Sequence, residues 1–150
     1  MTGNTAEFDL ERFVKAQEDV YATVLAQLKA GRKTTHWIWF IFPQIAGLGF
    51  SSTAQFYAIS SKAEAEAYLG HPVLGKRLDE CVRLMLAQDR KTAHDILGSP
   101  DDLKFCSCLT LFDAISPEGS VFEEALERFY NGRPDPKTLA LLDGSPSGSL

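Results

Sequence analysis

The chain has 150 residues, the length of one ordinary domain. A hydrophobic fraction of 45% and a charged fraction of 23% are typical of a globular protein and exclude a disordered or fibrous one. The formal net charge of −5 argues against the sequence-independent phosphate binding of a broad basic surface, so no nucleic-acid partner is expected.

Localisation signals and cysteine usage point to the cytoplasm. The first eight residues lack a basic start followed by an apolar run, and no stretch approaches the roughly 18 uncharged residues of a membrane span. The three cysteines, Cys81, Cys106 and Cys108, are too few for a secreted disulfide scaffold. The sequence therefore predicts a cytoplasmic protein with buried thiols and no membrane partner.

Helix start and stop signals recur along the whole chain. Three serine starts match the capping box, in which two side chains satisfy each other's free backbone donors: Ser52 with Gln55, Ser61 with Glu64, and Ser120 with Glu123. Ser99, His71 and Asp135 each precede a proline, which suits the first helical position. Glycines that suit helix ends stand at 31, 70, 98 and 132.

These signals, taken with the apolar spacing, predict an all-α protein. In chain order the expected helices cover 9–17, 18–30, 36–42, 52–59, 62–69, 72–88, 91–97, 100–115, 121–130 and 136–142. They predict a single compact multi-helix domain over 8–142, a flexible N-terminus at 1–7 and a flexible C-terminal tail at 143–150.

The run from 36 to 44, His-Trp-Ile-Trp-Phe-Ile-Phe-Pro-Gln, is the densest aromatic segment and holds both tryptophans. Such a segment either fills a core or lines a pocket where polar groups meet apolar walls. On a helix, Trp37 and Phe40 share one face, whereas Trp39 points elsewhere with His36. One tryptophan is therefore expected in the core and the other at a second surface.

His36 and Asp102 are the candidates for catalysis. His36 follows a basic segment, and histidine is the side chain that most readily changes its protonation near neutral pH. An inward-facing Asp102 would be its partner. The alternatives are structural: the imidazole caps the following helix, and Asp102 complements the positive end of its own helix.

The candidate ligand-binding residues either lie in or near the run from 36 to 44 or carry a polar group suited to a pocket. They are Arg32, Trp37, Trp39, Phe42, Gln44, Tyr57 and Lys104. Helix capping and core packing explain several of them equally well. No cysteine or histidine pair has metal-ligand spacing, and no nucleotide-cofactor signature occurs, so we expect no metal and no cofactor.

Several strings identify a resemblance to a known family. They include Phe8-Asp9-Leu10, His36-Trp37, Trp39-Phe40-Ile41-Phe42-Pro43-Gln44, Gly47-Leu48-Gly49, His71-Pro72-Val73-Leu74-Gly75 and Ser99-Pro100-Asp101-Asp102-Leu103-Lys104. From about Phe8 to Leu142 the chain resembles the uncharacterised bacterial family catalogued as domain of unknown function 1810. The resemblance implies an all-helical single domain of the Rv1873-like type with no established activity.

The order of elements from Ser52 to Leu139 is also loosely similar to that of the NADAR proteins, small helical domains that cleave N-glycosidic bonds. Ala54-Gln55 stands here where that family has a glutamate before its aromatic pair. The similarity is compatible with ligand binding without the same catalysis.

Two functional hypotheses follow. The first is an aromatic-walled pocket for a small anionic or nucleotide-like ligand, with hydrolysis as the favoured reaction if the protein is an enzyme. The second is a protein-interaction or homodimerisation module that uses the aromatic segment without catalysis. The expected state is a monomer or a weak homodimer.

Overall fold

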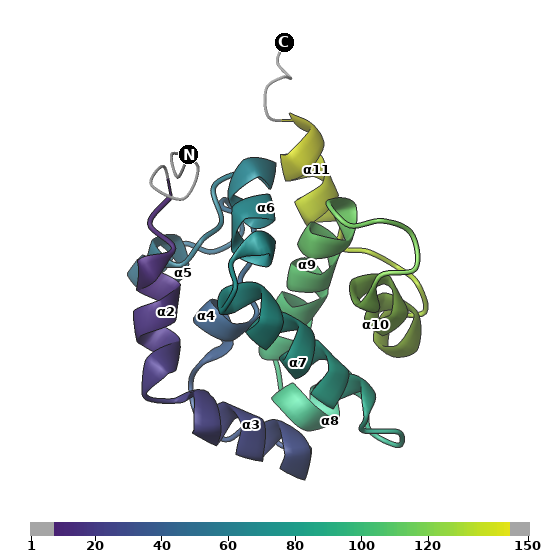
Figure 1. The fold of residues 1–150 in the computed structure, drawn as a ribbon. Helices are drawn as coiled ribbons and strands as arrows, with labels where there is room; N and C mark the ends of the chain where they lie inside the picture. The colour runs from purple at the N-terminus through teal and green to yellow at the C-terminus, as the bar shows by residue number, and fades with distance from the viewer. Residues whose placement is uncertain (1–7, 145–150) are drawn as a thin grey trace.

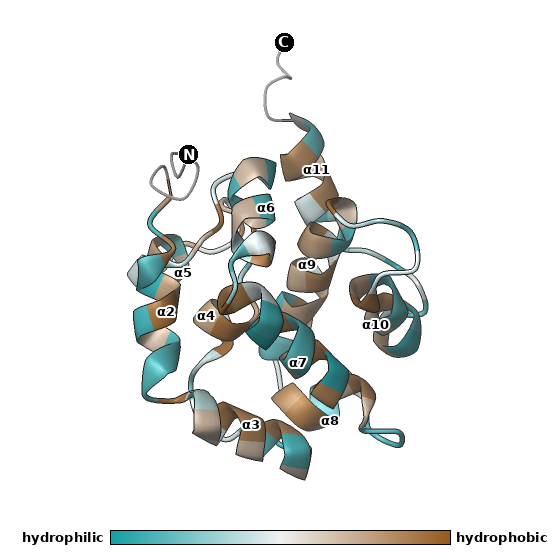
Figure 2. Ribbon diagram, in the orientation of Figure 1, coloured by the Kyte–Doolittle hydropathy of each residue, from teal (hydrophilic) through white to brown (hydrophobic). Residues whose placement is uncertain are grey.

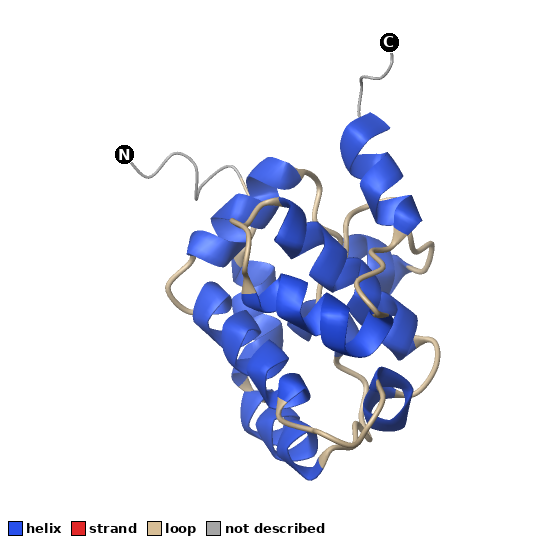
Figure 3. Ribbon diagram, turned by 90° about the vertical axis from the view of Figure 1, so that its right-hand side faces the viewer, coloured by secondary structure: helices blue, strands red, loops and turns tan. Residues whose placement is uncertain are grey.

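Ten helices and no strand make up residues 8–144, the part of the chain that the computed structural model describes (Figures 1 and 3). In chain order they are α2 (Glu11–Glu18), α3 (Tyr21–Ala30), α4 (Ile38–Ile41), α5 (Ser52–Phe56), α6 (Lys62–Gly70), α7 (Leu74–Leu86), α8 (Ala93–Leu97), α9 (Asp101–Ala114), α10 (Val121–Tyr130) and α11 (Pro136–Gly144). The predicted all-α class is confirmed, and each predicted helix has an observed counterpart.

Helix α9 lies at the centre of the molecule. It packs against α10, α8, α11, α6 and α4, and nearly every side chain from Phe105 to Phe112 is buried. A helix that is apolar on all sides is stable only when neighbours cover every side. Figure 2 shows the hydrophobic colouring along α9, whereas the outer face of α7 is mostly hydrophilic.

The predicted serine caps are present at three helix starts, one of them shifted by a residue. Of the three prolines predicted at first helical positions, only Pro136 begins its helix; α7 and α9 begin after Pro72 and Pro100. Ser61 and Ser120 accept hydrogen bonds from the backbone N–H groups of Glu64 and Glu123. Each glutamate then accepts from the residue before the serine, so the full capping box is not closed. The cap of α5 is Ser51 rather than the predicted Ser52.

Helices α6 and α7 meet at a close backbone contact. The Nδ1 atom of His71 accepts hydrogen bonds from the backbone N–H groups of Val73 and Leu74, which fixes the turn between the helices. A Cβ atom at Gly75 would lie 2.0 Å from the carbonyl oxygen of Leu69. Only glycine fits there.

A short pairing of two loops holds the segment after α4 in place. Ile45 and Ile59 form a parallel bridge, in which Ile59 N–H donates to Gln44 O at 2.8 Å and Ala46 N–H to Ile59 O at 2.8 Å. Two buried isoleucines thus fix the loop that follows the aromatic run. This loop forms one wall of the site described below.

Neither end of the chain tests the predicted flexibility. Residues 1–7 and 145–150 lie outside the described part, and the first two residues of the predicted tail, Asp143 and Gly144, belong to α11. Within the described part, no helix has the length and apolar character needed to cross a membrane.

Candidate functional site

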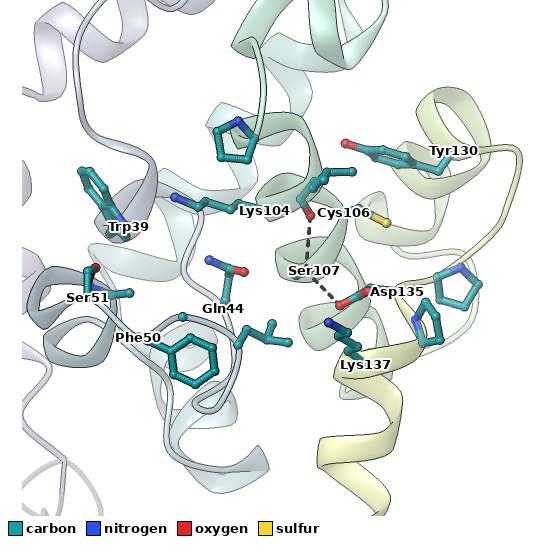
Figure 4. Close-up of a pocket in the computed structure, with 17 residues that line it drawn as sticks. Trp39, Gln44, Phe50, Ser51, Lys104, Cys106, Ser107, Tyr130, Asp135 and Lys137 are labelled. Carbon is teal, nitrogen blue, oxygen red and sulfur yellow. Dashed lines mark hydrogen bonds between the residues drawn. The ribbon is translucent and has the colours of Figure 1, made fainter.

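A hollow of about 660 Å³ opens beside the N-terminal half of α9, and we call it the α9 hollow (Figure 4). The α4–α5 loop forms one wall; the end of α10 and the segment leading into α11 form the other. Its apolar lining includes Trp39, Leu48, Phe50, Pro100, Leu103 and Pro136. Its polar and charged lining includes Gln44, Lys104, Ser107, Asp135 and Lys137.

Lys104 carries a positive charge that is only loosely paired. Its Nζ lies 3.9 Å from Asp101 Oδ1, whereas Lys33 Nζ lies 2.7 Å from Asp101 Oδ2. The Lys33 side chain is only 6% exposed, so it forms the tighter and drier pair and compensates most of the Asp101 charge. Lys104 therefore keeps an ammonium group that an anion in the hollow can use.

Two further polar groups face the same space without partners of their own. Neither the Gln44 side-chain amide nor the Lys137 ammonium makes a hydrogen bond or ion pair within residues 8–144. In Figure 4, Gln44 lies on the Trp39 side and Lys137 on the Asp135 side. Two lysines against one aspartate give the hollow a local positive charge on an acidic protein.

The thiol in the hollow is not a reactive nucleophile. Burial raises the pKa of Cys106 to about 11, and the neighbouring charge of Asp135 contributes to this rise. A thiol with that pKa is protonated at neutral pH, and only a thiolate attacks efficiently. The neighbouring Tyr130 is likewise held neutral, because burial raises its pKa and its hydroxyl donates to the carbonyl of Asp102.

Trp37 and Phe42 do not line the hollow, which corrects the prediction that both rings wall a pocket. Trp37 is 1% exposed and Phe42 is fully buried. The indole Nε1 of Trp37 donates to Gln27 Oε1 at 2.9 Å, and the same oxygen accepts from Thr34 N. Gln27 thus accepts the indole N–H of Trp37 inside the protein, and the ring is part of the hydrophobic core.

Trp39 does reach the hollow, as expected of the second tryptophan. It is half-buried, and Lys104 Nζ lies 5.1 Å from the ring centroid. This geometry is a cation–π contact, so the Lys104 ammonium covers part of the ring of this predicted ligand-binding residue. Trp39 therefore positions the ammonium as well as supplying apolar wall.

The predicted proton-transfer pair, His36 and Asp102, is not formed. His36 is exposed on the loop before α4 and does not line the α9 hollow. The Asp102 carboxylate lies 3.5 Å from His94 Nδ1 and accepts from Leu103 N, so its partners are on α8 and α9. Helix α4 begins only at Ile38, so His36 does not share a helix with Trp39.

Arg32 and Tyr57 lie outside the α9 hollow. Arg32 is exposed and lines a separate, open hollow with Lys91 and His94. Tyr57 is half-buried, packs edge-on against Phe56 and contacts a small adjoining space that also touches Trp39 and Gln44. Of the predicted ligand-binding residues, the structure brings Trp39, Gln44 and Lys104 together.

The opposite wall contains residues that the sequence patterns did not single out. The pattern at Asp135 predicts only a helix cap before Pro136, and Ser107 and Lys137 belong to no motif. The available signal was the sequence Asp-Pro-Lys-Thr at 135–138, which places a carboxylate, a lysine and a hydroxyl around one helix start. Among the described residues, no group of three histidine, cysteine, aspartate or glutamate side chains is placed to hold a metal ion.

Comparisons with known proteins agree on the family and the fold. The family described as "Protein of unknown function (DUF1810)" matches residues 7–142. The conserved hypothetical protein Rv1873 from Mycobacterium tuberculosis has a similar crystal structure, with a TM-score of 0.89 and 48% identity over 91% of this chain and 97% of that one. No curated protein matches the sequence.

Proposed function

This chain belongs to the DUF1810 family of proteins of unknown function, and from the geometry of the α9 hollow we propose that it binds a small anionic molecule with an apolar or planar body. A nucleotide-like ligand fits this description. The observation that carries the proposal is that Lys104, Gln44 and Lys137 line one apolar-walled hollow. Lys104 is only loosely paired there and, within the described part of the chain, the side chains of Gln44 and Lys137 are free to bind a ligand.

The size and the lining of the hollow support a small ligand. Its volume of about 660 Å³ falls within the roughly 300–1,000 Å³ typical of small-molecule sites. Such sites are mostly apolar with a few well-placed polar groups, which describes the contribution of Trp39, Leu48 and Leu103 around Lys104. Pairing with an ammonium group in a partly dry site is worth more than at the open surface.

A thermal-shift screen against nucleotides, sugar phosphates and dicarboxylates tests the proposal. A ligand at a hundredfold excess over its dissociation constant stabilises the folded protein by about 2.7 kcal/mol, which raises the melting temperature by several degrees. We expect stabilisation by at least one anionic class. The same screen includes product analysis, because Asp135, the carboxylate of the lining, is a candidate base for hydrolysis.

Charge-neutral variants assign the binding to the hollow. Lys104→Gln should weaken binding about tenfold or more, because a hydrogen bond to a charged group contributes about 1.5–3 kcal/mol. Lys76→Gln is the matched control, since Lys76 is an exposed lysine on α7 away from the hollow. Equal weakening in both variants, or no stabilisation by any anion, would contradict the proposal.

The exposed rim supports a second candidate, a protein-interaction or homodimerisation surface. Phe50 is 84% exposed and Leu103 is 64% exposed, and both border the hollow. Large exposed apolar side chains gathered at one place often mark a contact surface. Sedimentation velocity separates the two functions: a concentration-dependent dimer that Phe50→Ser abolishes would favour this candidate.

A further inference from the structure

A carboxylate stands in the wall of a hollow that otherwise favours anions. Asp135 Oδ2 accepts hydrogen bonds from Ser107 Oγ at 2.9 Å and from Thr138 N at 3.2 Å, and the Thr138 hydroxyl donates to it as well. The Asp135 backbone N–H donates to Thr110 Oγ1 at 2.8 Å. The side chain is thus fixed from α9 and from α11 at the same time.

The partners of this carboxylate are buried, so it cannot rotate freely. Thr138 is fully buried and Ser107 is 6% exposed, and Thr110, which holds the Asp135 backbone N–H, is 2% exposed. Ser107 has a single hydroxyl proton, and Asp135 at 2.9 Å competes well with the Leu103 carbonyl at 3.3 Å. The hydrogen bonds to this carboxylate all end on Oδ2, so within residues 8–144 its Oδ1 oxygen has no hydrogen-bond donor.

We propose that Asp135 Oδ1 selects ligands that carry hydroxyl or amino donors besides their anionic group. The proposal rests on the function proposed above and narrows the ligand class to phosphate esters of polyols, with nucleotides and sugar phosphates as examples. In this arrangement Lys104 and Gln44 bind the phosphate, and Asp135 accepts from the hydroxyl groups at the other side of the hollow.

Electrostatics favours this orientation. The Asp135 carboxylate repels a phosphate at short range, whereas Lys104 and Gln44 on the Trp39 side offer it a positive charge and a hydrogen-bond donor. A hydroxyl group can donate to a carboxylate, and such charge-assisted hydrogen bonds are about twice as strong as neutral ones. Lys137 lies more than 4.0 Å from the Asp135 carboxylate oxygens and leaves that oxygen open to the ligand.

Two matched ligand pairs test the proposal by titration calorimetry. The first pair is adenosine 5′-monophosphate and its 2′,3′-dideoxy analogue, and the second is sorbitol 6-phosphate and hexyl phosphate. Within each pair the charge is the same and the hydroxyl groups differ. We expect the wild-type protein to bind the hydroxylated member of at least one pair about tenfold or more tightly.

Variants then assign the preference to Asp135. Asp135→Ser keeps an oxygen that can cap α11 but removes the free carboxylate oxygen. The preference for the hydroxylated member of a pair should therefore fall to below about threefold. Asp135→Asn, which keeps the shape, is the second variant if the serine variant does not fold, and it should reduce the preference in the same direction. Asp89→Asn, at an exposed aspartate outside the hollow, is the control and should keep the preference.

The two proposals fail in different ways. Equal affinity of the wild-type protein for both members of each pair would overturn the role of Asp135 and leave anion binding intact. A preference that survives in both Asp135 variants would also overturn it. Binding of no member of either pair, by a folded wild-type protein, would overturn this inference, and anion binding as a whole would fall if the wider thermal-shift screen also gave no stabilisation.

Discussion

At the scale of single residues, the distances around Asp101 decide which lysine is structural and which is available. Lys33 is the close partner at 2.7 Å, and its ammonium also lies 5.2 Å from the centroid of the Trp37 ring. Lys104 is the distant partner at 3.9 Å, and its ammonium lies over Trp39. Both lysines thus lie near Asp101 and a tryptophan ring, but Lys33 stabilises the fold and Lys104 is available to a ligand.

This difference predicts unequal effects on stability. Lys33→Gln should lower the free energy of unfolding by about 2 kcal/mol, because it leaves a partly buried carboxylate without its main partner. Lys104→Gln should change it by less than about 1 kcal/mol, as for a loose ion pair near the surface. Urea denaturation followed by circular dichroism measures both. A larger loss in the Lys104 variant would contradict the assignment.

The start of α8 gives a prediction on pH. The Asp95 carboxylate accepts a hydrogen bond from the Thr92 backbone N–H at 3.0 Å, and this bond, with the nearby Thr92 hydroxyl, lowers the pKa of the Asp95 carboxyl. A lowered pKa in the folded state stabilises the protein above the ordinary pKa of aspartate, near 4, and this contribution is lost as the pH falls through the lowered value. Asp95→Asn should therefore be less stable than wild type at neutral pH.

The difference in stability between wild type and Asp95→Asn should narrow as the pH falls below about 4. Denaturation midpoints at a series of pH values give the comparison, with Asp89→Asn as the control for loss of an exposed charge. A gap that stays constant over this range would show that Asp95 contributes nothing through its ionised form.

At the scale of helices, the contact between α6 and α7 depends on one glycine. Gly75→Ala should cost about 3 kcal/mol or more, because its Cβ would overlap the Leu69 carbonyl and force the helices apart. Gly70→Ala is the matched control: it is also helical, and a Cβ atom added there would meet open space. That variant should be neutral or slightly stabilised. Equal melting temperatures for the two variants would contradict this packing.

The helices could be predicted from the sequence because their signals are local. Ser61, Ser120 and Gly31 mark helix ends through bonds that span only a few residues, and apolar spacing marks the buried faces. Errors occurred where a helix is too short for such signals. Helix α4 is a single turn, so a helical projection of residues 36–42 misplaced His36.

The site was harder to predict because distant segments assemble it. No local pattern shows that Gln27 binds the indole of Trp37 and makes that ring core, or that Trp39 remains at the surface. Asp135 meets Ser107 across 28 positions of sequence, through packing of α11 on α9. The sequence indicated Trp39, Gln44 and Lys104, but only the fold shows that they share a hollow.

At the scale of the whole molecule, the α9 hollow is a locally positive site on an acidic protein. The net charge of −5 repels anions at long range, and under the proposed function Lys104 and Lys137 attract them at short range. Added salt screens both effects with a Debye length near 8 Å at about 0.15 M. The proposed function therefore predicts that selection among anions depends on the shape and hydrogen bonding of the hollow more than on charge alone.

The two tryptophans provide the most direct measurement, because one lines the α9 hollow and the other is buried. The protein is titrated with the anion that stabilises it most, and tryptophan emission is recorded for wild type and for Trp39→Phe. We predict a saturable change in the wild-type emission, with a midpoint equal to the dissociation constant from calorimetry, and no such change when only Trp37 remains. An unchanged response in Trp39→Phe would place the ligand elsewhere and contradict binding in the α9 hollow.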